Sequence, residues 1–140
     1  MSERPYVYVA GPLFDEGERW WIETIEARIV AHGCETFLPH RDNPDKTADT
    51  TAVIFRNDRD AIIRCDLVVA NLNGVTTDDG TAWEIGYAYG IGKPIIGLFT
   101  DWRRRYDDEV VNLMLEQSID VIVRSLEELD AELESRLGEG

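Results

Sequence analysis

Short apolar runs alternate with longer amphipathic stretches along this 140-residue chain. The runs have the length and composition of buried strands, whereas the stretches between them repeat their apolar residues near the 3.6-residue period of a helix. The runs predict five strands, over residues 6–10, 35–38, 67–70, 94–99 and 119–123. The amphipathic stretches predict five helices, over residues 15–32, 52–64, 81–92, 109–117 and 125–137.

Residues with strong preferences at element ends support these boundaries. Gly33 follows the first predicted helix in the position of a C-terminal cap, and Pro39 ends the second strand. Ser125 and Glu128 fit an N-terminal capping box at the start of the last helix. Polar segments without this periodicity are predicted to be loops, over residues 40–51, 71–80 and 101–107.

The alternation of strands and helices predicts a single α/β domain over residues 1–140. Strands that are apolar throughout are typical of parallel sheets with helices on both faces. Right-handed crossovers then give a doubly wound, five-stranded sheet, for which we predict the flavodoxin-like strand order 2-1-3-4-5. Ligands of such sheets bind beyond the carboxyl ends of the strands, at the switch point between strands 1 and 3. We therefore expect functional residues in the loops that follow Ala10, Ala70 and Phe99.

Charge and composition exclude several classes of partner. The formal net charge of −14 makes nucleic acid and anionic membranes poor partners, because both would be repelled. No apolar run reaches the ~20 residues that span a bilayer, and the polar N-terminus does not resemble a signal peptide, so we expect a cytoplasmic protein. Cys34 and Cys65 are flanked by core-like segments and are predicted to be buried, reduced thiols. No cysteine or histidine spacing indicates a metal site.

The chain is acidic and also poor in lysine, since Lys46 and Lys93 are its only lysines. Such a surface favours the hypothesis of a protein adapted to high salt, where repulsion between its own charges is screened. An acidic protein from an ordinary habitat is the alternative, and composition alone leaves both open.

The loop after the first strand reads Gly11-Pro12-Leu13-Phe14. A glycine here could let the backbone approach a ligand. The segment has neither the GxGxxG pattern of dinucleotide sites nor the Lys-Ser/Thr of a P-loop. Taken alone, it is better interpreted as a tight turn from strand to helix.

The segment after the third strand, Asp78-Asp79-Gly80-Thr81-Ala82-Trp83-Glu84, is richer in candidate chemistry. The predicted helix over 81–92 puts Glu84 in its first turn, where the helix dipole favours an ionised carboxylate. An ionised carboxylate at the switch point could attack a sugar carbon. Thr81 and Glu84 also fit a capping box, in which Glu84 would fold back onto the Thr81 amide. A capping box does not require further acids nearby, so Asp78 and Asp79 favour a functional site.

Other polar residues have simpler interpretations when they are taken one at a time. Asp66 begins the third strand, away from the expected site, and is predicted to be structural. Asp58 is typical of a solvated helix face, and Asn112 of a surface amide. Leu113 and Met114 would be ordinary core residues.

Together, these segments resemble the nucleoside 2-deoxyribosyltransferase family. The first strand and its loop, Tyr8-Val9-Ala10-Gly11-Pro12-Leu13-Phe14, are similar to the start of that family's domain. The pairs Asn57-Asp58 and Cys65-Asp66 have the family's spacing. The run from Asp78 to Ala88 resembles its Asp-x-Gly-x-x-x-Glu-x-Gly-x-Ala signature, and Asn112-Leu113-Met114 resembles its Asn-Leu-Met. The similarity extends from residue 6 to about residue 123.

The resemblance implies an enzyme that transfers 2-deoxyribose between nucleobases, with deoxynucleosides and free bases as substrates, without metal or organic cofactor. It assigns the catalytic and substrate-binding roles as follows: Glu84 as nucleophile; Tyr8 as the holder of its carboxylate; Asp58 as the group that handles the proton of the base; Asp78 and Asn112 as ligands of the 5′-hydroxyl; Gly11, Pro12 and Phe14 as further substrate contacts; and Met114 beside Glu84. It also implies a homo-oligomer, dimeric or larger, in which Asn112 reaches a neighbouring subunit's site.

The chemistry of such a site is coherent. Cleavage of an N-glycosidic bond passes through an oxocarbenium-like transition state, which a negative Glu84 would stabilise and then capture as an ester with C1′. A protonated Asp58 would assist departure of the base. Attack by a second base from the same side then gives overall retention.

Two departures from the family limit what the resemblance implies. Residues 40–52, where some members contact the base, have no clear counterpart, so the preference for purine or pyrimidine stays open. The predicted helix after Val123 gives no sign of a terminal carboxylate in the site.

Two alternatives to the transferase remain. One is an N-glycoside hydrolase of 2′-deoxynucleosides or their 5′-monophosphates, although Asp78 would repel a phosphate and Arg103–Arg105 are typical of a solvated loop. The other is a non-catalytic nucleotide-binding module. A Glu84 carboxylate close to Tyr8 would favour an enzyme, whereas one folded onto the Thr81 amide would favour the capping box.

Overall fold

The computed structural model describes residues 4–103 and 106–137. Its centre is a five-stranded, all-parallel sheet in the order β2-β1-β3-β4-β5, as predicted. The strands span the following residues: β1 Tyr6–Ala10, β2 Glu35–Phe37, β3 Leu67–Asn71, β4 Ile95–Leu98 and β5 Val121–Val123. The helices span the following: α1 Glu16–Ala31, α2 Pro39–Asp42, α3 Thr51–Arg64, α4 Asp79–Gly90, α5 Leu113–Ser118 and α6 Leu126–Leu137.

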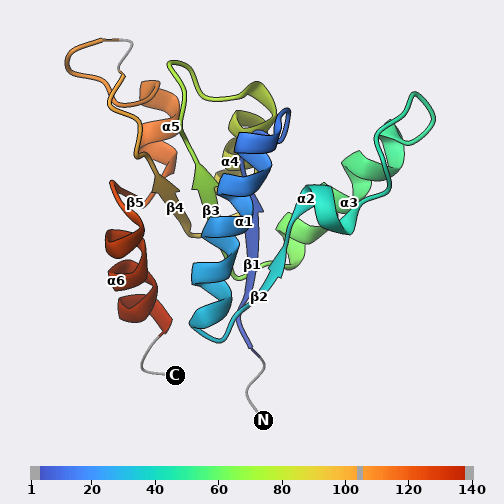
Figure 1. Cartoon of the computed structure of the whole chain (residues 1–140), viewed down its shortest axis with the longest axis horizontal. Coiled ribbons are helices and arrows are strands. Elements are labelled where there is room, and N and C mark those ends of the chain that lie inside the picture. The colour runs from blue at the N-terminus through green and yellow to red at the C-terminus, as the bar shows by residue number, and fades with distance from the viewer. Residues whose placement is uncertain (1–3, 104–105, 138–140) are drawn as a thin grey trace.

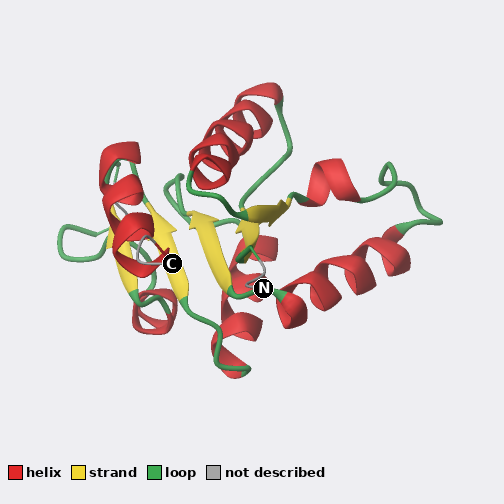
Figure 2. Cartoon of the chain, turned by 90° about the horizontal axis from the view of Figure 1, so that it is seen from below, coloured by secondary structure: helices red, strands yellow, loops and turns green. Residues whose placement is uncertain are grey.

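Helices cover both faces of the sheet (Figures 1 and 2). Alternate residues of each strand face opposite layers. In β1, Val7 and Val9 pack with α1 and α6, whereas Tyr8 and Ala10 pack with α3, α4 and α5. Both layers are closely filled by aliphatic side chains, and burial of each such side chain contributes ~1.5–3 kcal/mol to folding. This packing fixes the edge of the sheet from which the loops after β1 and β3 emerge.

The segment formed by α2, its following loop and α3 extends from the β2 edge of the sheet (Figures 1 and 2). Ala61 and Ile62, in the last turns of α3, are its buried residues, whereas Val53 and Phe55 near its start are exposed. The first half of α3 is therefore held by few core contacts, and it forms one wall of a cleft beside the sheet.

Several element ends differ from the prediction. Residues 39–42 form the short helix α2 inside the predicted loop, with Pro39 in its first turn, where a missing N–H is tolerated. Helix α4 begins at Asp79 rather than at Thr81, because Asp78 caps it. Helix α5 begins only at Leu113 and β5 only at Val121, because Asn112 caps α5 and Ile119 still belongs to its C-terminal end.

Predicted caps elsewhere are confirmed. Gly33 follows α1 with a φ of +87°, the left-handed conformation that favours glycine. Ser125 caps α6, since its hydroxyl accepts from the Glu128 amide at 3.0 Å, but the Glu128 carboxylate accepts from the Arg124 amide and not from that of Ser125, as a capping box would require. Helix α1 has a full capping box of Asp15 and Glu18, which the sequence analysis did not identify.

Cys34 and Cys65 are buried free thiols, in agreement with the prediction. Asp66 is structural, because its carboxylate accepts a hydrogen bond from the Tyr6 amide at 2.9 Å. Among the described residues, no helix combines the length and apolar character required to cross a bilayer.

Candidate active site

A cleft of about 520 Å³ opens at the carboxyl end of β1, between the β1–α1 loop, the segment after β2, α3 and the start of α4. This is the switch point at which a ligand site was predicted. Seven of the predicted site residues line it or contact a lining residue: Tyr8, Gly11, Pro12, Phe14, Asp58, Asp78 and Glu84.

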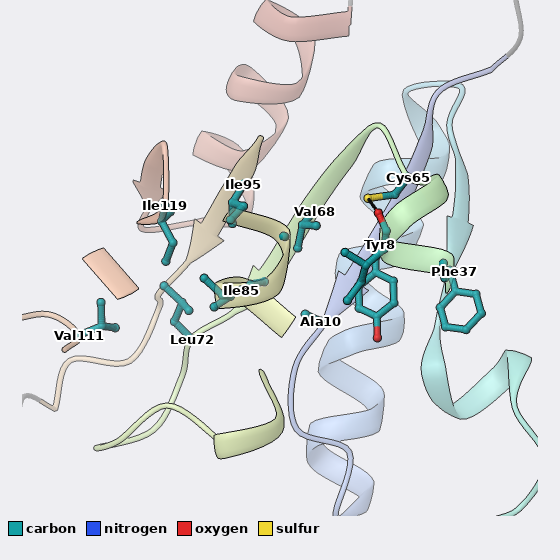
Figure 3. Packing of buried hydrophobic residues seen from close by; sticks show 14 of the residues in the cluster. Tyr8, Ala10, Phe37, Cys65, Val68, Leu72, Ile85, Ile95, Val111 and Ile119 are labelled. Carbon is teal, nitrogen blue, oxygen red and sulfur yellow. Dashed lines mark hydrogen bonds between the residues drawn. The ribbon is translucent and has the colours of Figure 1, made fainter. Parts of the chain in front are cut away.

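Tyr8 and Glu84 are joined by a short hydrogen bond at the cleft. The Tyr8 hydroxyl donates to Glu84 Oε2 at 2.5 Å. The Tyr8 ring is buried and stacks on Phe37 with centroids 5.3 Å apart, so its hydroxyl has a fixed position (Figure 3). Because one oxygen of Glu84 is held in this way, Oε1 is left as the oxygen that could meet a substrate.

The capping-box interpretation of Thr81 and Glu84 is wrong. The Thr81 amide and hydroxyl both donate to Asp78 Oδ2, at 2.9 and 3.0 Å. Since α4 starts at Asp79, Glu84 lies in its second turn, and its carboxylate bonds to Tyr8 instead of the Thr81 amide. The geometry is therefore the one that favours an enzyme.

Burial opposes the helix dipole, which was expected to favour an ionised Glu84. Burial raises the pKa of Glu84 from 4.5 to about 8, and the nearby Asp58 and Asp78 carboxylates raise it further, against the Tyr8 hydrogen bond, which lowers it. The dipole effect fades within the first turn of a helix. Burial therefore favours the protonated form of Glu84 near neutral pH.

Burial also raises the pKa values of two neighbouring groups, Tyr8 and Asp58. Burial, together with the charges of Glu84 and Asp58, raises the pKa of Tyr8 well above its ordinary value, so Tyr8 remains a donor. Burial also raises the pKa of Asp58, opposed by a hydrogen bond from Asn43. Asp58 is half-buried and lines the cleft. The interpretation of Asp58 as part of a solvated helix face, which its sequence context alone suggested, is therefore wrong.

Gly11 has a packing role in addition to its place in the cleft. A Cβ atom at this position would lie 2.6 Å from Ile22 Cδ1 and 2.9 Å from Asn71 Cβ. The chain can turn from β1 into the cleft wall at this point only because residue 11 has no side chain. The turn and the ligand-site interpretations of this loop are therefore compatible.

A family model described as nucleoside 2-deoxyribosyltransferase matches residues 7–118. The chain belongs to the nucleoside 2-deoxyribosyltransferase family. No curated protein sequence matches it significantly.

Solved structures similar to this family member cover nearly the whole chain. A conserved protein from Enterococcus faecalis is 27% identical, with a TM-score of 0.84 over 96% of this chain and 100% of its own. A 2-deoxyribosyltransferase from Leishmania mexicana is 27% identical, with a TM-score of 0.73 over 95% of this chain and 99% of its own. A CMP N-glycosidase from Clostridium botulinum is 25% identical, with a TM-score of 0.62 over 92% and 98%.

Two residues that the family resemblance assigns to the site lie outside the cleft of their own chain. Asn112 caps α5 by accepting from the Met114 amide at 2.8 Å. Asn112 and Met114 line a second cavity of about 330 Å³ between the β3–α4 loop and α5. Met114 is 70% exposed and Leu113 58%, so the interpretation of both as core residues is wrong. They lie in the first turn of α5, outside both core layers.

Five polar residues of the cleft were missed by the sequence analysis: Arg19, His40, Asn43, Asp45 and Lys46. Arg19 lies on α1 and donates to the Leu13 carbonyl at 2.9 Å, whereas the other four belong to α2 and the loop after it. No motif marks them. The one available signal was the density of polar and proline residues after Phe37. By contrast, Arg103 pairs with Asp101, and residues 104 and 105 lie outside the described residues.

Proposed function

We propose that this protein transfers a 2-deoxyribosyl group between nucleobases by cleaving the N-glycosidic bond, with Glu84 as the nucleophile. The observation that carries the proposal is the hydrogen bond of 2.5 Å from Tyr8 to Glu84 Oε2 in a cleft at the switch point of the sheet. This bond orients the carboxylate and leaves Oε1 for C1′ of the sugar. Family membership supports N-glycosidic chemistry at this position.

In the first step, the bond between C1′ and the base nitrogen breaks as Glu84 Oε1 approaches C1′ from the opposite side. The electron pair leaves with the base, whose nitrogen takes a proton from Asp58. Glu84 and C1′ then form an ester. In the second step, the nitrogen of an incoming base attacks C1′ and returns a proton to Asp58, and Glu84 regains its electron pair. Two inversions give net retention.

The proposed roles require a particular distribution of protons between Glu84 and Asp58. Burial raises the pKa of both acids, and the charge of Asp58 raises that of Glu84 further. The reactive form is the one with Glu84 ionised and Asp58 protonated. A developing positive charge on the sugar favours that form, because it stabilises the adjacent Glu84 anion.

The direct test is incubation with deoxyadenosine and excess cytosine, and with deoxyadenosine alone, using wild type and Glu84→Ala. We expect deoxycytidine from the wild type only, and a deoxyribosyl adduct on Glu84 detectable by mass spectrometry. Glu134→Ala, an exposed acid on α6, is the matched control and should behave as wild type. Equal activity in Glu84→Ala would contradict the role of Glu84.

A second candidate is hydrolysis of a 2′-deoxynucleoside 5′-monophosphate. Two observations favour it: Arg19 and Lys46 line the cleft, and a structural relative is a CMP N-glycosidase. The two cations could hold a phosphate despite Asp78. Comparison of deoxycytidine with its 5′-monophosphate decides this question. Release of free cytosine from the nucleotide but not from the nucleoside, at a rate that is lower in Arg19→Ala, would support the hydrolase. Equal rates with the two substrates would exclude a phosphate subsite.

We also propose that the protein works as a homo-oligomer in which Asn112 and Met114 complete a neighbouring site. Neither residue lines the cleft of its own chain. Phe55, Trp83 and Tyr87 form a ladder of ring contacts across α3 and α4, with Phe55 49% and Trp83 44% exposed. A contiguous set of exposed aromatic rings is typical of a protein–protein interface, and burial against a second copy would remove it from water.

A further inference from the structure

Asn43 is bound on three sides by groups from two elements. Its Nδ2 donates to the Pro39 carbonyl at 2.9 Å and to Asp58 Oδ1 at 2.7 Å. Its Oδ1 accepts from Asn57 Nδ2 at 3.0 Å. The opposite amide orientation would bring its oxygen against a carbonyl and a carboxylate, so these contacts fix which end of the amide faces Asp58.

The contact with Asn43 makes the two oxygens of Asp58 different. An amide N–H can only donate, so Oδ1, to which Asn43 donates, cannot carry the proton that points along that bond. The carboxyl proton is then directed to Oδ2. Asp58 lines the cleft beside Glu84, so Oδ2 is the oxygen from which a proton can reach a leaving base.

We propose that Asn43 is a positioning residue that directs the proton of Asp58 toward the leaving nucleobase. It does so without contact with the reacting atoms, through the carboxylate that it holds. The proposal rests on the proposed function, because it assumes that Asp58 protonates the base. Asn43 directly follows the short helix α2, which brings its amide to Asp58 on α3.

Substrates with different leaving groups test the proposal. A nucleobase leaves well only when it is protonated, whereas 4-nitrophenolate leaves as a stable anion without a proton. For Asn43→Ala we expect a ~10–100-fold lower kcat/KM with deoxyadenosine, the size of a general-acid contribution, and release of nitrophenolate from 4-nitrophenyl 2-deoxyribofuranoside within a few-fold of wild type. Asp58→Asn should show the same contrast.

The pH profile with deoxyadenosine supplies a second readout. Activity that needs protonated Asp58 falls as pH rises through its pKa. The hydrogen bond from Asn43 lowers that pKa, so Asn43→Ala should move the alkaline limb to higher pH, which a merely structural role would not do. Other charged or titratable groups face the same cleft and are unchanged in this variant: Tyr8, Arg19, His40, Asp45, Lys46, Asp78 and Glu84.

The outcomes separate this proposal from the proposed function. Glu84→Ala should lose activity toward both substrates. Activity retained in this variant would overturn the proposed function instead. An equal loss of activity toward both substrates in Asn43→Ala would overturn the positioning role. An alkaline limb of the pH profile at the same pH as in wild type would also overturn it. Asn57→Ala removes the neighbouring amide contact without touching Asp58, and it should change the leaving-group contrast less than Asn43→Ala does.

Discussion

At the residue scale, the proposed reaction and the burial of Glu84 favour different protonation states of its carboxyl group. The proposed reaction needs its carboxylate as an anion, yet its burial favours the neutral acid and raises its pKa to about 8. The Tyr8 hydroxyl offsets part of this cost, because its hydrogen bond favours the charged form. A carboxyl kept in such a place costs the fold stability, which is typical of functional sites.

This cost predicts the pH dependence of stability. The pKa of Glu84 is higher in the folded protein than its ordinary value of 4.5, so its contribution is fully present below about pH 4.5 and is lost as pH rises to about 8. We expect Glu84→Gln to remove this dependence, and to be more stable than wild type by on the order of a few kcal/mol at pH 9.

Urea denaturation of wild type and Glu84→Gln at pH 5, 7 and 9 measures the effect. Glu134→Gln is the matched control on the exposed face of α6 and should leave the pH dependence unchanged. A difference between wild type and Glu84→Gln that stays constant from pH 5 to pH 9 would show that Glu84 does not titrate in this range.

At the element scale, the start of α4 decides where Glu84 lies. Asp78 accepts from the amide and hydroxyl of Thr81, so the helix begins at Asp79 and turns Glu84 toward Tyr8. Asp78 therefore has a structural role as a helix cap, besides the contact with a substrate hydroxyl that the family resemblance implies. The same side chain caps the helix and lines the cleft.

Two substitutions separate these roles. Asparagine caps a helix about as well as aspartate, whereas loss of a cap costs about 0.5–2 kcal/mol. We expect Asp78→Asn to keep its thermal stability but bind substrate more weakly, and Asp78→Ala to lose both. Thermal unfolding and KM are the measurements. A full loss of stability in Asp78→Asn would mean that the negative charge, not the cap geometry, holds the start of α4.

At the scale of the whole molecule, the net charge of −14 acts on the fold as self-repulsion. Salt screens this repulsion over a distance of ~10 Å at 0.1 M and ~3 Å at 1 M. If the acidic surface is an adaptation to a salty interior, we expect the midpoint of thermal unfolding to rise steadily from ~0.1 M to ~2 M KCl. An equal concentration of a neutral osmolyte is the control, and the same rise with both would indicate solvent exclusion instead of charge screening.

The proposed oligomer makes a separate prediction. If Asn112 serves a neighbouring site, a mixture of two inactive variants, Glu84→Ala and Asn112→Ala, should regain activity after refolding together. About half of the dimers then contain one copy of each variant, and one of the two sites in each such dimer has both Glu84 and Asn112 intact. About a quarter of wild-type activity is therefore expected for a dimer. No recovery, with mixed assemblies demonstrated by native mass spectrometry, would mean that Asn112 does not act across an interface.

The sequence by itself determined the topology and singled out Glu84 as the candidate nucleophile. Five short runs separated by amphipathic stretches have few alternatives to a doubly wound sheet, because the central runs must be buried on both faces, as β3 and β4 are. The switch point of that sheet then singles out the loops after β1 and β3. Glu84 and Asp78 belong to a local signature, so their spacing along the chain was sufficient to find them.

Only the tertiary structure decided how these groups act. The Tyr8 bond to Glu84 joins residues 76 positions apart, and the raised pKa of Glu84 depends on side chains that bury it from several elements. The capping of α4 by Asp78 and the hydrogen bond from Asn43 to Asp58 likewise depend on which of several possible partners the fold brings within hydrogen-bonding distance. Local periodicity carries no information about such competition, because burial and charge at a site are sums over the whole fold.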